Sequence, residues 1–78
     1  MTKDEWLRKA KKLHKAAVVE QRNSNGSSKC SMKEATDMNE LQHAIGSHHA
    51  PKQVTYNELR ISLDEMFDWV KSGSKKVS

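Results

Sequence analysis

Four side chains in the middle of the sequence are of the types that bind metal ions or act as nucleophiles. Cys30 is followed by His43, His48 and His49, and thiolate and imidazole are the usual ligands of zinc. The intervening gaps of twelve and then four residues match no closed zinc pattern, and adjacent histidines rarely supply two ligands to one ion. We therefore expect solvated loop histidines and no bound metal.

Cys30 is also a poor candidate for a catalytic nucleophile. An active cysteine needs a base beside it, and nothing in the sequence places a histidine beside this one. The chain has no glycine-rich phosphate loop, no Gly-x-Ser-x-Gly elbow and no His-Glu-x-x-His motif. Asp64, Glu65 and Asp68 cluster on the polar side of a predicted helix, where we expect them to be solvated. The sequence thus predicts an ordinary loop thiol, no cofactor and no enzymatic activity.

Three capping boxes mark the elements that position these side chains. In such a box a Ser or Thr precedes the helix and a Glu or Gln stands three residues later, so that each satisfies a free N–H of the first turn. Each box here precedes apolar residues that recur every three or four positions, which predicts helices over about 3–22, 32–45 and 56–71. The pairs are Thr2 with Glu5, Ser31 with Glu34, and Thr55 with Glu58.

Each predicted helix has one apolar face. The first face has Leu7 and His14 at its edge, the second is narrow, and the third is the strongest because Phe67 widens it. The faces consist of Trp6, Ala10, Leu13 and Ala17; of Ala35, Met38, Leu41 and Ile45; and of Tyr56, Leu59, Leu63, Met66 and Val70.

The segments between and after the helices are polar. Residues 23–30 are expected to form a loop or linker, Gly46 and Pro51 to stop the second helix, and residues 73–78 to form a flexible tail. Loops of roughly ten residues favour antiparallel neighbours. We therefore expect an all-α fold, a small bundle of three amphipathic helices that dimerisation can complete.

The length of 78 residues limits the chain to one small domain over residues 1–78. Hydrophobic residues make up 35% and charged residues 31%, and a core of this size rarely supplies more than about 3–5 kcal/mol of net stability. A second copy is the easiest supplement, so we expect a homo-oligomer, most simply a homodimer. The single cysteine, the charged N-terminus and the lack of any apolar run longer than Ala16–Val19 predict a cytoplasmic protein outside the membrane.

The basic residues are concentrated in the first helix. The formal net charge is +4, and residues 1–30 carry eight Lys or Arg against three Asp or Glu. At about 100° per residue, five of these side chains share the helix face opposite Trp6 and Leu13, with Val19 among them. We call this set the basic stripe: Arg8, Lys11, Lys12, Lys15 and Arg22.

Three interpretations of the basic stripe are open. It can be a solvated face that complements the acidic second and third helices, within the chain or across a dimer. It can dock on an acidic protein partner. It can also contact the phosphates of a nucleic acid, nonspecifically, because no aromatic residue interleaves the stripe and the other two helices carry three basic residues against seven acidic ones.

Two apolar residues of the third helix stand apart from its core face. Ile61 lies about 160° around the helix from Leu59 and Leu63, and Trp69 lies at the edge of the apolar face. Single exposed apolar residues are common, but Trp is also enriched at binding hot spots. The sequence favours a non-enzymatic protein-binding module, of the small accessory or inhibitor type, that modulates a larger macromolecular partner. The alternative is a nucleic-acid-binding protein that uses the basic stripe.

Overall fold

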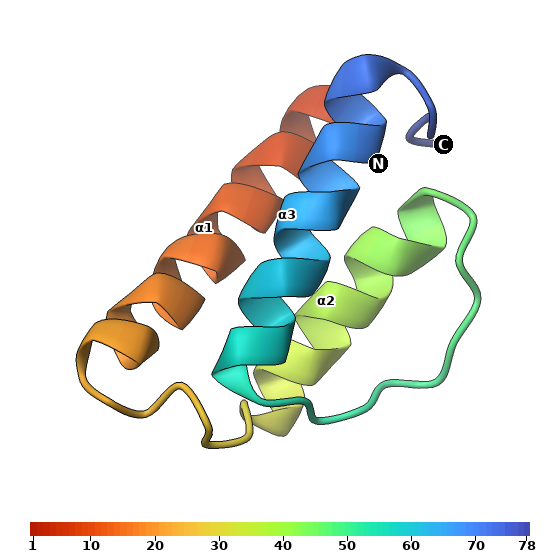
Figure 1. The fold of residues 1–78 in the computed structure, drawn as a ribbon. Helices are drawn as coiled ribbons and strands as arrows, with labels where there is room; N and C mark the ends of the chain where they lie inside the picture. The colour runs from red at the N-terminus through yellow and green to blue at the C-terminus, as the bar shows by residue number, and fades with distance from the viewer.

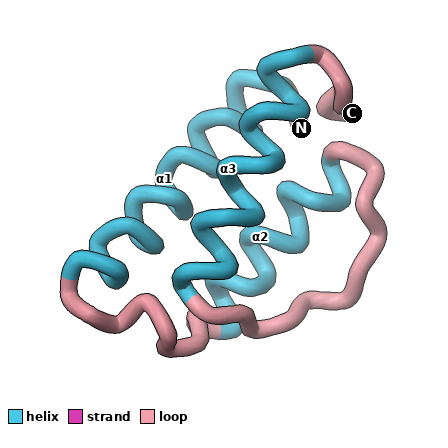
Figure 2. Tube along the Cα trace, in the orientation of Figure 1, coloured by secondary structure: helices cyan, strands magenta, loops and turns pink.

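The helices begin where their capping residues predict, in a computed structural model that describes all residues from 1 to 78 (Figures 1 and 2). The capping residue of each helix has an extended backbone, and its side-chain oxygen accepts the N–H of the Glu three residues later. The helices are α1 (Lys3–Arg22), α2 (Met32–Ala44) and α3 (Tyr56–Ser72). The prediction of an all-α fold with three helices is confirmed.

The two ends of each helix match the prediction to within one residue. Only the α2 cap completes the reciprocal box, because Glu34 accepts the N–H of Ser31 at 3.0 Å while the Ser31 side chain accepts the N–H of Glu34. Helix α2 stops at Ala44, one residue early, and the chain then turns at Gly46 with φ 90°. Helix α3 runs one residue further than predicted and ends before Gly73, whose φ of 82° is readily adopted by glycine.

Helices α2 and α3 run parallel to each other, and α1 runs antiparallel to both (Figure 1). The N-terminal ends of α2 and α3 meet where the Cys30 N–H donates to the Val54 carbonyl at 2.8 Å. At the opposite end, the Ser78 N–H donates to the Ala44 carbonyl at 2.9 Å. The expectation of antiparallel neighbours is therefore confirmed for α1 and α2 and wrong for α2 and α3. The reason is that the connection 45–55, kept extended near Pro51, is long enough to return along α2, which is about 20 Å long.

The core lies between the three helices and follows the predicted apolar faces. Trp6 is fully buried, its indole N–H donates to the Leu41 carbonyl at 3.0 Å, and its ring meets Phe67 edge-on at a centroid distance of 5.8 Å. Cys30 lies outside the helices, yet its side chain is 1% exposed and belongs to this core. The buried hydrophobic residues are Trp6, Ala10, Leu13, Ala17, Cys30, Ala35, Met38, Leu41, Ile45, Leu59, Leu63, Met66 and Val70.

The loop 23–30 and the C-terminal segment both make backbone contacts with distant elements. Gly26 accepts the N–H of Asn57 at 2.9 Å, and a Cβ at Gly26 would lie 2.5 Å from Asn57 Oδ1, so a larger residue there would displace the Asn57 side chain. The Tyr56 N–H donates to the Ser28 carbonyl at 3.0 Å. The segment 73–78 folds back so that Ser78 reaches the end of α2. None of the three helices combines the length and apolar character needed to cross a bilayer.

Candidate protein-binding face

The basic stripe is exposed along the outer side of α1. All five of its side chains are solvent-exposed, and none of them forms an ion pair within the chain. The ion pairs of the structure are Lys9 with Glu40, His14 with Asp64, and Arg60 with Asp64. Within the chain, Lys9 and His14, which flank the core face, are the residues of α1 that contact acidic side chains of α2 and α3. The charges of the basic stripe are not neutralised by any ion pair.

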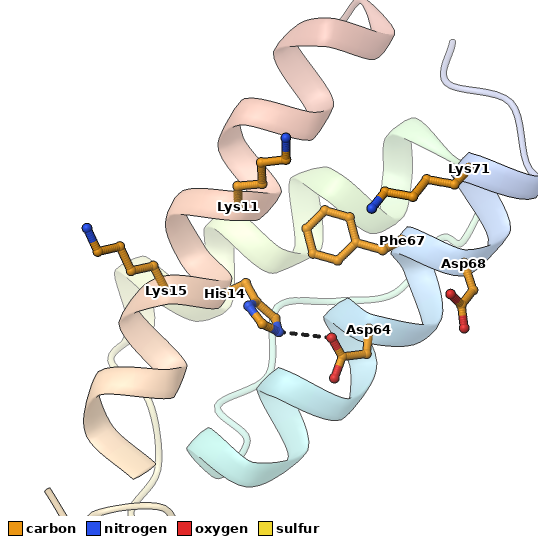
Figure 3. A pocket seen from close by; sticks show the side chains of 7 residues that line it. All are labelled: Lys11, His14, Lys15, Asp64, Phe67, Asp68 and Lys71. Atoms are coloured by element: carbon orange, nitrogen blue, oxygen red, sulfur yellow. Dashed lines mark hydrogen bonds and ion pairs between the residues drawn. The ribbon is translucent and has the colours of Figure 1, made fainter. Parts of the chain in front are cut away.

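An open groove of about 550 Å³ separates the basic stripe from α3 (Figure 3). Phe67 is the one hydrophobic residue in its lining. The His14 ring meets Phe67 edge-on at a centroid distance of 5.8 Å, and Lys71 Nζ lies 5.4 Å from the centroid of the same ring. The lining residues are Lys11, His14, Lys15, Asp64, Phe67, Asp68 and Lys71.

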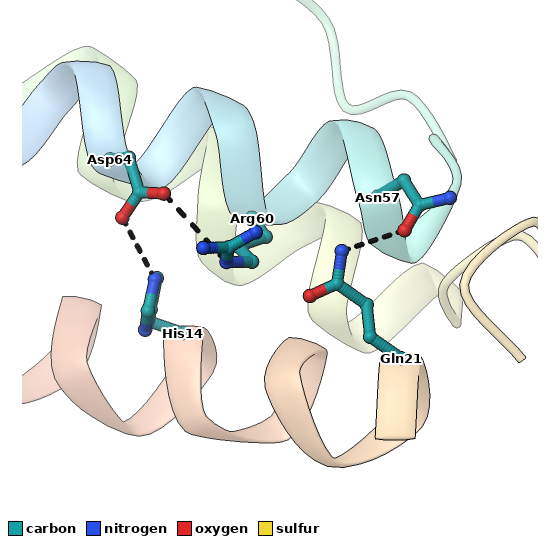
Figure 4. A network of polar contacts seen from close by, with 5 residues as sticks. All are labelled: His14, Gln21, Asn57, Arg60 and Asp64. Atoms are coloured by element: carbon teal, nitrogen blue, oxygen red, sulfur yellow. Dashed lines mark hydrogen bonds and ion pairs between the residues drawn. The ribbon is translucent and has the colours of Figure 1, made fainter. Parts of the chain in front are cut away.

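A polar network crosses the groove and fixes α1 against α3 (Figure 4). His14 Nε2 lies 2.9 Å from Asp64 Oδ1, and Arg60 Nε lies 3.8 Å from Asp64 Oδ2. Two turns further along α1, the Gln21 amide donates to Asn57 Oδ1 at 2.6 Å. No Ser, Thr or Cys lines the groove, so the imidazole has no hydroxyl or thiol there to activate. The network can hold two helices in register.

The outer face of α3 is acidic, with an apolar residue at its centre. Ile61 is 56% exposed, and Glu65 and Asp68 follow it on the same helix face without forming ion pairs. With Asp64 at its edge, we call this set the acidic ridge: Asp64, Glu65 and Asp68.

Charged residues of both helices line this groove. Lys11 and Lys15 of α1 lie on one side, and Asp64, Asp68 and Lys71 of α3 lie on the other (Figure 3). Val19, within the stripe, is 44% exposed. We call the exposed surface around the groove the α1/α3 face.

Trp69 lies apart from this face. It is 39% exposed and lines a small groove of about 120 Å³ between α2 and α3, together with Gln42, Ser47, His49 and Glu65. Of the residues singled out from the sequence, Lys11 and Lys15 line the groove between α1 and α3, Lys12 lines a groove beside α2, and Trp69 lines the groove between α2 and α3.

Cys30, His43, His48 and His49 do not come together as a ligand set, and the expectation of loop histidines is wrong for His43, which lies in the last turn of α2. No group of three or more His, Cys, Asp or Glu side chains is arranged to hold a metal ion. His43 and His48 are neighbours, with 3.4 Å between their Nδ1 atoms, and His43 Nε2 lies 3.2 Å from the His49 carbonyl oxygen. Cys30 is buried and forms no disulfide within the chain.

A hydrogen bond between Tyr56 and Glu34 joins the first turns of α2 and α3. The Tyr56 hydroxyl donates to Glu34 Oε1 at 2.9 Å, and this hydrogen bond, followed by burial, raises the pKa of Tyr56 to about 12. Burial is the largest influence on Glu34 and opposes ionisation, but hydrogen bonds from the Ser31 N–H, the Tyr56 hydroxyl and the Ser31 hydroxyl outweigh it and lower the pKa of Glu34. The pair holds the two parallel helices together at their N-terminal ends.

Sequence reasoning missed three of these polar contacts. Only the position of His14, at the edge of an apolar face, indicated that it would meet a neighbouring helix. Nothing marked Asn39, which is 6% exposed and donates to the His49 carbonyl at 2.7 Å while its Oδ1 has no partner. Nothing paired Glu34 with Tyr56.

No protein-family model matches this chain, and no curated protein or solved structure matches it either.

Proposed function

We propose that the chain is a non-enzymatic protein-binding module that docks on an acidic region of a larger macromolecular partner through the basic stripe of α1. It would act as a small accessory or inhibitor-type protein. The observation that carries the proposal is that all five basic side chains are exposed and none is paired within the chain. A chain whose single cysteine, Cys30, is free and buried fits a cytoplasmic setting for this function.

The geometry of the stripe suits charge-guided docking. Its residues span Arg8 to Arg22 on one straight helix, a length of about 21 Å. A row of like charges of this length steers an oppositely charged surface during encounter and raises the association rate. Val19 adds an apolar contact within the row.

A protein partner fits the surroundings of the stripe better than a nucleic acid does. Asp64 and Asp68 line the α3 side of the groove, so phosphates that settled over Lys11 and Lys15 would also approach Asp68. No aromatic side chain lies in the stripe to stack on a base. A protein surface can match the basic and acidic parts of the α1/α3 face together.

The test compares two triple variants with the same change in net charge. Lys11, Lys12 and Lys15 are replaced by Glu in the first variant, and the exposed Lys52, Lys75 and Lys76, which lie outside the stripe, are replaced in the control. Each protein is immobilised and exposed to host lysate with and without nuclease. We expect the wild type and the control to retain a nuclease-resistant protein partner that the stripe variant loses.

Binding kinetics with the retained partner refine this test. The stripe variant should associate more slowly and dissociate at a nearly unchanged rate, because charge steering acts mainly on encounter. Nuclease-sensitive capture, together with submicromolar duplex binding at physiological salt that the stripe variant loses, would contradict the proposal and establish the nucleic-acid alternative.

A further inference from the structure

Three lysines line the groove between α1 and α3, and they come from both of its walls. Lys11 and Lys15 belong to α1, and Lys71 belongs to α3. All three side chains are exposed, and none of them forms an ion pair. The positive charge around the groove therefore extends beyond the basic stripe, because Lys71 places a cation on the opposite helix.

The two carboxylates of the groove differ in how free they are. Asp64 is already held by two basic side chains, with His14 Nε2 at 2.9 Å from Oδ1 and Arg60 Nε at 3.8 Å from Oδ2. Asp68 forms no ion pair, and its carboxylate points away from the Phe67 ring (Figure 3). One unpaired aspartate thus stands against three unpaired lysines, and the groove has an excess of positive charge.

Phe67 supplies one apolar surface among these charges. Its ring is half-buried, and Trp6 and His14 meet it edge-on, each at a centroid distance of 5.8 Å. The part of the ring that these contacts leave open lines the groove, where it lies between Lys11 and Lys71 (Figure 3). An apolar side chain placed on this ring would have a lysine on either side, one from each helix.

We propose that the groove receives an acidic segment of the partner protein in which an aliphatic side chain stands between carboxylates. The aliphatic side chain packs against Phe67, and the carboxylates on either side of it meet the lysines of the two walls. The groove volume of about 550 Å³ is in the range of sites for small ligands, so only a few side chains of the segment enter it. The inference rests on the proposed function, because it specifies which segment of the acidic partner docks beside the basic stripe.

The surroundings of Phe67 favour a peptide over a nucleotide in this groove. Lys71 Nζ lies over the Phe67 ring at 5.4 Å from its centroid, so a nucleobase that stacked on this face would displace the cation. An aliphatic side chain can contact the open part of the ring and leave Lys71 in place to bind a carboxylate.

A short synthetic peptide tests the site directly. The probe is a fluorescein-labelled peptide with three glutamates on each side of a central leucine, and the matched peptide carries serine in place of the leucine. We expect fluorescence anisotropy to show saturable binding of the leucine peptide. The serine peptide should bind at least about fivefold more weakly, because it loses the apolar contact with Phe67. Salt should weaken the binding of both peptides.

Two single substitutions on α3 change the charge of the groove and leave the basic stripe intact. Lys71→Glu should weaken binding of the leucine peptide roughly tenfold, because it removes a cation and adds a repulsive charge. Asp68→Asn should strengthen this binding about twofold, because it removes the unpaired carboxylate. Lys52→Glu is the control for Lys71→Glu, since it makes the same charge change at an exposed residue outside the groove, and it should bind like the wild type.

Far-ultraviolet circular dichroism is recorded for each variant, and the comparison of the two peptides uses the wild type alone. Equal binding of the leucine and serine peptides would overturn the inference, as would unchanged binding by Lys71→Glu or weaker binding by Asp68→Asn. A single-stranded oligonucleotide that binds more tightly than the leucine peptide, and that Lys71→Glu no longer binds, would assign the groove to nucleic acid instead.

Failure of this site is distinguishable from failure of the proposed function. If Lys71→Glu retains the protein partner as well as the wild type does, and the triple variant of the stripe loses it, the proposed function stands and the groove is not its docking site. If the triple variant retains the partner too, the proposed function itself fails.

Discussion

The N-terminal ends of α2 and α3 and the outer face of α1 and α3 are both polar, and they use polar side chains in opposite ways. At the helix ends the polar groups are paired within the chain: Tyr56 donates to Glu34 at 2.9 Å, and the Gln53 amide donates to the Cys30 carbonyl at 2.9 Å. On the α1/α3 face Lys11, Lys15 and Asp68 have no ion-pair partner.

This difference separates residues that stabilise the fold from residues available for binding. A group that is paired in the folded chain contributes stability and loses it on substitution. A solvated charge contributes little to folding, so it can be replaced without unfolding the chain. Substitutions should therefore change the free energy of unfolding most in the interior and least on the exposed face.

The largest contrast is expected between two apolar residues of opposite exposure. Leu41→Ala should lower the free energy of unfolding by about 3 kcal/mol, because Leu41 is fully buried beneath Trp6 and truncation leaves a cavity. Ile61→Ala should change it by less than about 0.5 kcal/mol in the monomer. Urea denaturation of both variants at low protein concentration measures the difference. Equal losses would show that Ile61 has a role in the monomer fold.

Cys30 should behave as an interior group although it lies in a loop. Cys30→Ser should lower the free energy of unfolding by about 2 kcal/mol, because the serine hydroxyl would be buried next to apolar side chains without a hydrogen-bond partner. Cys30→Ala should lower it by less. The native thiol should also react slowly with an aromatic disulfide reagent and quickly once urea unfolds the chain. Rapid reaction of the native protein would contradict the buried position.

The Tyr56 to Glu34 hydrogen bond should contribute a smaller, pH-dependent amount. Tyr56→Phe should lower the free energy of unfolding by about 1 kcal/mol at neutral pH. Because the folded pKa of Tyr56 is raised from 10 to about 12, the wild-type advantage is complete below pH 10 and is lost as the pH rises through about 12. The lowered pKa of Glu34 acts at the other limit: its contribution is present above 4.5 and is lost as the pH falls through the folded value. Thermal unfolding of both proteins across this range is the measurement.

The smallest effect on stability should come from the basic stripe. Replacing Lys11, Lys12 and Lys15 by Glu should change the free energy of unfolding by less than about 1 kcal/mol, since all three side chains are exposed and unpaired. The same substitutions should remove partner binding. Urea denaturation at low protein concentration gives the stability of the monomer. A loss of several kcal/mol would mean that the stripe supports the fold rather than binding.

Local signals predicted the helices, and long-range contacts escaped them. The hydroxyls of Ser31 and Thr55 fix the helix starts through bonds only three residues long, and the spacing of Leu59 and Leu63 shows which side of α3 is buried. Burial of Cys30 depends instead on the return of residues 53–55 alongside the first loop, which no local pattern encodes. Because residues 53–55 come back to the N-terminal end of α2, α3 runs parallel to α2.

The candidate site divides in the same manner. The stripe could be found from helix periodicity because all of its members belong to α1. That Lys11 and Lys15 face Asp68 across a groove, whereas Trp69 lies in the groove between α2 and α3, depends on which side of α3 meets α1. Contacts such as His14 with Asp64 set that rotation, and they join residues 50 positions apart.

The connection between α2 and α3 also bears on how quickly the chain folds. Helices α1 and α2 can meet by closing a short loop, but Leu63 and Phe67 must wait until α3 has returned past the whole of α2. Contacts of such long sequence separation slow folding, although doubling the length of a loop changes stability by only about 0.6 kcal/mol. Doubling the length of 45–55 with glycine and serine should therefore lower the free energy of unfolding by only about 0.6 kcal/mol and slow folding by no more than about threefold.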